Sequence, residues 1–85
     1  MAKYKLLFKK SVAKDLRSLP KKDVRKILQR IDTLSEDPRA LGSKKLSGQE
    51  FYRIRQGVYR IIYEILYDQL IVHVIKIAHR SKSYM

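Results

Sequence analysis

The sequence contains no cysteine, and only eight of its 85 residues are acidic. The absence of cysteine excludes disulfide bonds and every metal site that uses thiolates. A Gly-rich phosphate loop, an H-E-x-x-H pattern and a G-x-S-x-G nucleophile motif are missing as well. The two histidines, His73 and His79, have no partner at metal-ligand spacing. We therefore expect no metal and no small-molecule cofactor.

Long apolar runs are also missing. No stretch approaches the roughly 18 uncharged apolar residues that a membrane-spanning helix needs. The N-terminus, M-A-K-Y-K-L-L-F-K-K, lacks the apolar segment of a secretory signal. These absences predict a soluble cytoplasmic protein with no membrane partner.

What the chain does have is positive charge. Lys and Arg number 20 against 8 acidic residues, which gives a formal net charge of +12. Such an imbalance is typical of proteins that bind polyanions, including RNA, DNA, an anionic membrane surface or an acidic protein. A chain of this length supports one compact core, so we expect a single domain over residues 1–85.

The first half of the chain predicts a short strand and two helices. Apolar and charged residues alternate over Lys3–Lys9, which predicts a short strand. Its lysines would discourage edge-to-edge pairing if the strand lies at the edge of the sheet. Ser11 is the expected N-cap of a first helix that reaches Leu19. A second helix follows and is expected to end at Pro38. Its apolar stripe consists of Val24, Ile27, Leu28, Ile31 and Leu34.

The second half predicts three strands. After a loop over Arg39–Gly48, three runs of β-branched and aromatic residues alternate within Phe51–Tyr84. Tight turns are expected at Gln56–Gly57 and Asp68–Gln69. The last run is apolar on both sides, as a central strand should be. The predicted fold is α+β: a small twisted, mainly antiparallel sheet packed against an N-terminal αα-hairpin, in the order β-α-α-β-β-β.

Arginines interrupt these strands at selected places. Arg53 and Arg55 share one face of their strand, with Tyr52 and Ile54 opposite. In the next strand Arg60, Ile62 and Glu64 share a face, and Tyr59, Ile61, Tyr63 and Ile65 take the other. Arg80 and Tyr84 follow the last strand. The pattern predicts that several guanidinium groups and a phenol converge near one end of the sheet and bind phosphate.

The remaining ionisable groups have structural interpretations. His73 lies inside an apolar strand, which favours a hydrogen-bonded packing role. Glu64 is expected to pair with a strand arginine rather than to act as a general base. The lysines and arginines of the two helices are by default solvated surface charges.

Four segments together resemble the RelE branch of the RelE/ParE toxin superfamily. They are K-K-L-S-G at 44–48, F-Y-R-I-R at 51–55, G-V-Y-R-I-I-Y-E-I at 57–65 and V-I-K-I-A-H-R at 74–80, with a tyrosine close behind. The resemblance covers nearly the whole chain and is most specific over 57–63. Two features depart from it: arginines stand at 53 and 55, where the family often carries lysines, and the gap from Arg80 to Tyr84 is short.

The resemblance implies a toxin of a type II toxin–antitoxin pair that cuts mRNA in the ribosomal A site without a metal. A ribose 2′-hydroxyl attacks the adjacent phosphodiester. Arg60 and Arg80 are then expected to hold the scissile phosphate, and Arg53 and Arg55 to complete the site. Arg55 orients the 2′-hydroxyl, and Tyr84 stacks on a base. Since an arginine or a tyrosine is a poor base near neutrality, we expect charge stabilisation and alignment to dominate.

Further expectations concern the proton, the ribosome and the antitoxin. His79 is a possible proton carrier, because an imidazole titrates near neutrality. The partner is expected to be a cognate RelB-like antitoxin with an acidic wrapping segment. Exposed cations are expected to contact ribosomal RNA, with a steep dependence on salt. They are Lys14, Arg17, Lys21, Lys22, Arg25, Lys26, Lys44 and Lys45.

Two other functions fit the same sequence. One is a ParE-like inhibitor of DNA gyrase that cleaves nothing, since one fold supports both activities. The other is a basic RNA-binding module without catalysis. The complete set of Arg53, Arg55, Arg60, Arg80 and Tyr84 favours the nuclease, because gyrase inhibitors generally lack it in full.

Overall fold

Two helices and a five-stranded sheet make up the part of the chain that the computed structural model describes, residues 3–39, 42–46 and 51–79. The elements in chain order are β1 (Lys5–Phe8), α1 (Lys10–Arg17), α2 (Lys21–Leu34), β2 (Lys44–Lys45), β3 (Phe51–Gln56), β4 (Tyr59–Leu66), a 3-10 turn (Tyr67–Gln69) and β5 (Ile71–His79).

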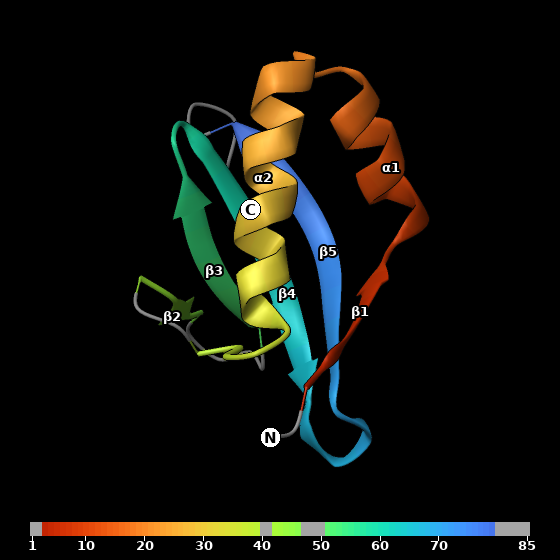
Figure 1. The fold of residues 1–85 in the computed structure, drawn as a ribbon, viewed down its shortest axis with the longest axis vertical. Coiled ribbons are helices and arrows are strands. Elements are labelled where there is room, and N and C mark those ends of the chain that lie inside the picture. The colour runs from red at the N-terminus through yellow and green to blue at the C-terminus, as the bar shows by residue number, and fades with distance from the viewer. Residues whose placement is uncertain (1–2, 40–41, 47–50, 80–85) are drawn as a thin grey trace.

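The strands are ordered β1-β5-β4-β3-β2 (Figure 1). β1 runs parallel to β5, and the other neighbours are antiparallel. The predicted α+β class is confirmed, as is the interior position of β5, and the structure places β1 at the edge of the sheet. The structure adds β2, where the sequence predicts a loop. Its two residues pair with Arg53 and Tyr52, and a strand this short has no periodicity to detect.

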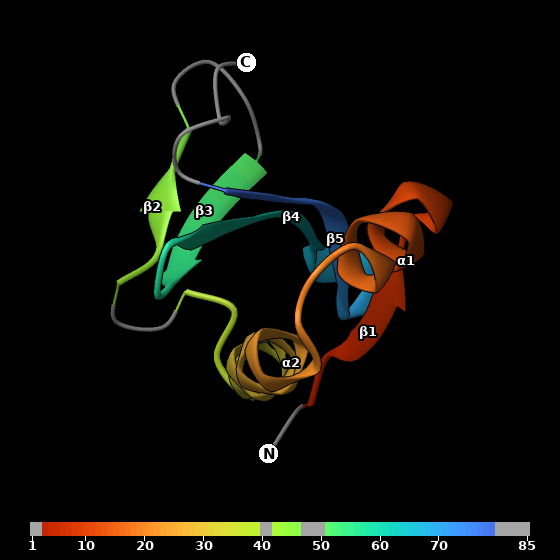
Figure 2. The ribbon, with the colours of Figure 1, turned by 90° about the horizontal axis from the view of Figure 1, so that it is seen from above.

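Both helices lie on one side of the twisted sheet, and the other side carries no helix in the described part of the chain (Figure 2). The core fills the space between the helices and the sheet. Burying each of its large apolar side chains contributes about 1.5–3 kcal/mol. The helices supply Val12, Ile27, Ile31 and Leu34, and the sheet supplies Tyr52, Ile54, Tyr59, Ile61, Tyr63, Ile65, Val72, Val74 and Ile77.

The predicted helix ends need correction. Ser11 is not the N-cap of α1: the helix begins at Lys10, and Lys9 precedes it without a side-chain cap. α2 ends at Leu34, before Pro38, and the Ser35 hydroxyl donates to the Asp32 carbonyl at 2.7 Å. Steric conflict with proline only forbids the helix from continuing past that point. Local hydrogen bonding ends it one turn earlier.

A β-bulge in β5 sets which way its last residues face. Ile62 is paired with Lys76 and Tyr63 with Val74, so Ile75 has no partner of its own on β4. One extra residue reverses the alternation of side chains beyond it. Ile77 and His79 therefore face the helices.

The turn between β3 and β4 lies one residue later than predicted. It occupies Gly57 and Val58, with Gly57 at φ 61°. This left-handed conformation favours glycine and is typical of two-residue hairpin turns. The register places Arg55 opposite Arg60, so the turn aligns the two arginines.

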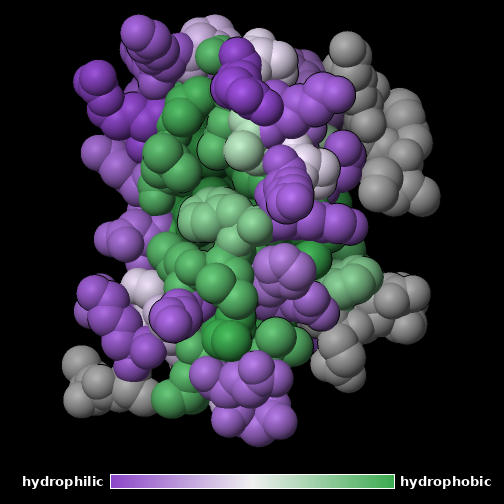
Figure 3. Space-filling view, turned by 90° about the vertical axis from the view of Figure 1, so that its right-hand side faces the viewer, coloured by the Kyte–Doolittle hydropathy of each residue, from purple (hydrophilic) through white to green (hydrophobic). Residues whose placement is uncertain are grey.

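The β1 side of the molecule exposes apolar surface among charged residues (Figure 3). Leu7 and Phe8 are both 43% exposed, while Lys5 on the same strand and Lys9 directly after it are also exposed. Lysines at a free strand edge discourage pairing with another chain. Within the described residues, no helix combines the length and apolar character that a membrane crossing requires.

Tyr63 ties the sheet to the segment after α2. Its side chain is fully buried, and its hydroxyl donates to the Pro38 carbonyl at 2.6 Å. Burial raises the pKa of Tyr63 to about 12. In the unfolded chain a tyrosine ionises near pH 10. The resulting stability is therefore complete below about pH 10 and is lost as the pH rises through about 12.

Comparing the wild type with Tyr63→Phe isolates this effect. At pH 9 the variant is expected to be less stable by about 1–3 kcal/mol, because the Pro38 carbonyl loses its donor. Between pH 9 and pH 12 the wild type should lose about 2–3 kcal/mol relative to the variant. Urea denaturation at both pH values measures the difference. A constant gap between the two proteins would contradict the assigned burial.

Candidate functional site

Three arginines lie together on the helix-free face of the sheet, and we call Arg53, Arg55 and Arg60 the arginine cluster. The register places Arg55 of β3 directly opposite Arg60 of β4. Opposed side chains in an antiparallel pair start about 4.5–5.5 Å apart, and residues i and i+2 about 7 Å apart. Long guanidinium side chains span these separations, so all three can reach one phosphate. The structure places these three residues together on one face, and their role in binding a phosphate stays a prediction.

The arginine cluster holds like charges close together. The pKa of Arg53 is lowered, first by burial and then by the positive charges of Arg55 and Arg60. The Nε atom of Arg60 is buried and has no hydrogen-bond partner in the described part of the chain. Repulsion and unsatisfied donors both cost stability. A bound oxyanion would relieve both costs, since its oxygens accept from several guanidinium groups.

Apolar side chains lie beside the arginine cluster. Ile62 lies across from Arg53 on one side and Lys76 on the other. Ile62 also lines a pocket together with Leu46, Phe51 and Ile75. The helix-free face therefore combines cations with an apolar floor, which suits the charged backbone and flat bases of a single-stranded nucleic acid.

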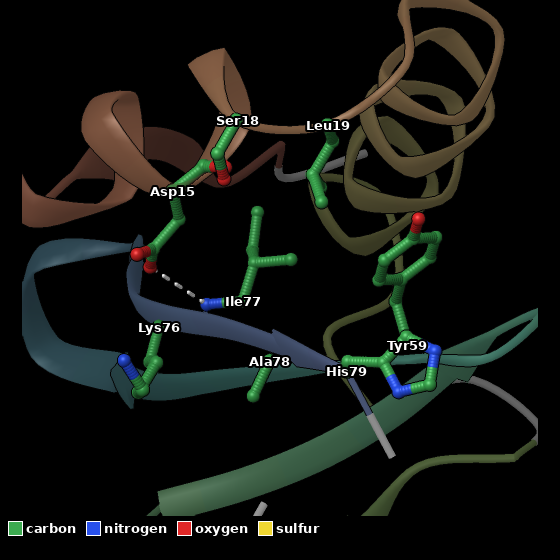
Figure 4. A pocket seen from close by; sticks show the side chains of 8 residues that line it. All are labelled: Asp15, Ser18, Leu19, Tyr59, Lys76, Ile77, Ala78 and His79. Carbon is green, nitrogen blue, oxygen red and sulfur yellow. Dashed lines mark hydrogen bonds between the residues drawn. The ribbon is translucent and has the colours of Figure 1, made fainter. Parts of the chain in front are cut away.

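His79 faces the helices, away from the arginine cluster. Its ring meets Tyr59 edge-on, with centroids 5.8 Å apart and planes at 87°. The Tyr59 hydroxyl donates to Asp23 of α2 at 2.7 Å, which raises the pKa of Tyr59. Figure 4 shows His79 and Tyr59 in a pocket that Asp15 of α1 also lines. The candidate proton carrier and the arginines thus lie on opposite faces of the sheet.

His73 lies on the helix-free face and pairs with Glu64. Its Nδ1 lies 2.8 Å from the Glu64 carboxylate. The hydrogen-bonded role predicted for His73 is confirmed. The sequence predicts an arginine as the partner of Glu64, and the structure shows His73 instead. Glu64 lies four residues along β4 from Arg60, or about 13 Å, so this pair is too far away to serve the same phosphate.

Arg30 is a further cation that the sequence did not indicate. Its position on the polar side of α2 predicts only a solvated charge. In the structure it lines a pocket at the outer edge of β3, which we call the edge pocket: Arg30, Gly42, Ser43, Lys44, Arg53 and Arg55. The sequence feature connected with this contact is the glycine at position 42, because a Cβ there would lie 3.0 Å from a terminal nitrogen of Arg30.

The remaining predicted residues divide into three groups. Arg80 and Tyr84 lie outside the described residues. Lys44 lies opposite Arg53 and shares its face, whereas Lys45 lies opposite Tyr52 on the helix side. The helix cations are exposed, on the opposite side of the sheet from the arginine cluster. They are Lys14, Arg17, Lys21, Lys22, Arg25 and Lys26.

No group of three or more histidine, aspartate or glutamate side chains in the described ranges is arranged to hold a metal ion. The chemistry available on the helix-free face is that of guanidinium groups: binding, alignment and stabilisation of negative charge.

A helix pair on one face of a small sheet and arginines on the other define a basic α+β fold. The model of a known family, the ParE toxin of the type II toxin–antitoxin system parDE, matches residues 6–84. The chain therefore belongs to the RelE/ParE superfamily of toxins from type II toxin–antitoxin systems, and the predicted resemblance is confirmed.

The individual proteins to which this chain is similar include several RelE toxins. The chain is 35% identical over 86 residues to a protein of Methanocaldococcus jannaschii named "Putative toxin RelE1", covering 96% of each chain. Its fold matches RelE in the RelE–RelB complex of Pyrococcus horikoshii OT3, with a TM-score of 0.84, 31% identity, and coverage of 98% of this chain and 100% of that one. It also matches isolated Escherichia coli RelE, with a TM-score of 0.81, 25% identity and coverage of 94% and 87%.

Proposed function

We propose that this toxin is a ribosome-dependent endoribonuclease that cuts mRNA in the A site and so stops translation. The observation that carries the proposal is the arginine cluster, in which Arg53, Arg55 and Arg60 share the helix-free face within reach of one phosphate. Similarity to RelE toxins supports the same activity. The ribosome as target implies action in the cytoplasm.

The reaction needs no group beyond the RNA, the protein and water. The 2′-hydroxyl loses its proton to water and its oxygen forms a bond to phosphorus, which gives a 2′,3′-cyclic phosphate. The bond from phosphorus to the 5′-oxygen breaks, and the leaving oxygen takes up a proton from water. Negative charge grows on the phosphate oxygens in between. Arg60 and Arg55 stabilise that charge, at about 10²–10³-fold per donor. Arg80 and Tyr84 are the proposed remaining contacts, to the phosphate and to a base.

The side chain of His79 points to the opposite face of the sheet from the arginine cluster. His73 pairs with Glu64, about 13 Å along β4 from Arg60. The proposal therefore assigns catalysis to charge stabilisation and to alignment of the 2′-oxygen, phosphorus and leaving oxygen. The ribosome contributes alignment by fixing the mRNA, and alignment alone is worth several kcal/mol. Free RNA is accordingly expected to be a poor substrate.

The proposed inhibitor is a RelB-like antitoxin with an acidic segment. Solved relatives from Pyrococcus horikoshii and Escherichia coli are complexes of RelE with RelB. The net charge of +12 favours a partner of opposite sign. Such a segment would cover the helix-free face and neutralise the arginine cluster.

Cleavage on programmed ribosomes tests the proposal. Purified toxin is added to ribosomes that hold a defined codon in the A site, and the 5′ ends of the mRNA are mapped. Cuts at a fixed phase of the reading frame, absent without ribosomes, are expected. Gyrase inhibition is the second candidate, because the matched family model describes ParE. Intact mRNA together with blocked DNA supercoiling would replace the nuclease by that function.

A further inference from the structure

We propose that the edge pocket binds a second phosphate of the RNA strand, next to the phosphate that is cut, and that Arg30 is the phosphate-binding residue that completes it. The inference rests on the proposed function and extends it from one phosphate to two. It starts from a group of cations that distant segments bring together at the outer edge of β3.

The edge pocket is built from three parts of the chain. Arg30 comes from α2, Lys44 from β2, and Arg53 and Arg55 from β3. β2 is only two residues long and pairs with Tyr52 and Arg53. The edge of β3 beside Arg55 is therefore not covered by β2, and the pocket opens there.

The charges of the lining residues favour an anion as the ligand of the edge pocket. Four of the six lining residues are cations, and none is acidic. Three of these cations are guanidinium groups, whose planar forks match the oxygens of a phosphate. Burial lowers the pKa of Arg53, and the charges of Arg55 and Arg60 lower it further. A second anion would offset the repulsion among these arginines.

Gly42 keeps room for Arg30. Its φ of 96° is a conformation that other residues rarely adopt, and a Cβ there would lie 3.0 Å from a terminal nitrogen of Arg30. The loop at Gly42 and helix α2 therefore pack closely around the guanidinium group of Arg30. A charge that merely faced solvent would not need such a fit.

The edge pocket and the arginine cluster share Arg53 and Arg55. Adjacent strands lie about 4.8 Å apart. The outer edge of β3 is therefore roughly one or two strand spacings, about 5–10 Å, from the space between Arg55 and Arg60. One nucleotide of an extended strand covers such a distance. A single-stranded RNA is favoured over an acidic peptide because the shared arginines are the proposed catalytic ones.

The test measures binding of a short 2′-O-methyl oligouridylate, which cannot be cleaved, at several salt concentrations. Arg30→Gln is expected to weaken binding on the order of tenfold. It should also reduce the slope of log affinity against log salt by about 0.7, the loss of one phosphate contact on a single strand. Arg30→Lys should restore the slope but only part of the affinity. The control Arg39→Gln, at an exposed arginine outside both groups, should change neither value.

Other results would overturn the inference. A lower melting temperature for Arg30→Gln with an unchanged salt slope would assign Arg30 a purely structural role. Loss of affinity for a polyglutamate peptide, with RNA binding unchanged, would assign the pocket to an acidic protein. Because the probe is never cleaved, the salt slope is independent of nuclease activity. If the wild-type toxin cleaves mRNA but Arg30→Gln leaves the salt slope unchanged, the edge pocket is refuted and the nuclease function stands. If the wild-type toxin does not cleave mRNA but Arg30→Gln reduces the slope, only the proposed reaction is refuted.

Discussion

Replacing Arg60 by glutamine is expected to lower the rate of mRNA cleavage on programmed ribosomes by about 10²–10³-fold. Arg60 lies opposite Arg55, and its half-buried guanidinium group includes an Nε–H with no partner in the described part of the chain. Glutamine keeps a polar side chain but removes the charge and the planar fork. Arg60→Lys should recover part of the rate, because it restores the charge without the fork.

The folding stability of Arg60→Gln is the internal control for this prediction. Removing one of several neighbouring like charges should leave stability unchanged or raise it. Single-turnover cleavage and urea denaturation on the same preparations separate the two effects. Lys5→Gln on β1, at the opposite edge of the sheet, should retain full activity. Undiminished cleavage by a folded Arg60→Gln protein would remove the arginine cluster from the reaction.

Replacing Ile61 by alanine is expected to lower the free energy of unfolding by about 2–5 kcal/mol. Ile61 follows Arg60 in β4 but faces the helices and is fully buried in the core. Truncation there leaves a cavity beneath the strand that carries the arginine. Small domains have about 5–15 kcal/mol of stability in total, so a large share is lost.

Leu7→Ala is the matched control for the core, since Leu7 is 43% exposed. Its expected cost is about 0.5 kcal/mol or less. Denaturant midpoints measure both variants. Equal, small costs at the two positions would contradict the assignment of opposite faces to Arg60 and Ile61, on which the location of the site depends.

The alternating pattern of the strands predicts much of the site. In β3 and β4 the arginines face away from the helices, and most of the apolar and aromatic residues face the helices, because one face of the sheet is buried and the other is more open. Phe51 and Ile62 are exceptions that lie on the same face as the arginines. Aromatic and β-branched residues on one parity make this pattern readable from the sequence. The arginine cluster could therefore be predicted before any coordinates.

The same reasoning could not place the end of β5. Its residues are apolar on both sides of the strand, so nothing in the pattern marks Ile75 as the bulged residue. The bulge reverses the direction of every side chain after it. For that reason the sequence could identify His79 as a titratable group near Arg80 but could not show that it faces Tyr59 and the helices.

Tertiary contacts account for the other differences. Arg30 reaches the edge of β3 because the loop after α2 brings Gly42 against it. Glu64 pairs with His73, nine residues later, because the register that follows the β4–β5 turn sets them opposite each other. The alternation of residues predicts the strands, but it does not give the register that selects these partners.

The proposed site requires that the guanidinium groups of Arg53, Arg55 and Arg60 gather around one phosphate. Heteronuclear NMR of the arginine Nε–Hε groups, during titration with a 2′-O-methyl RNA, measures this gathering. The three signals are expected to shift together and saturate at one RNA concentration, with protection of the Arg60 Nε–H from solvent exchange. Shifts confined to arginines of the helices, such as Arg17 and Arg25, with the strand arginines unmoved, would contradict the proposed site.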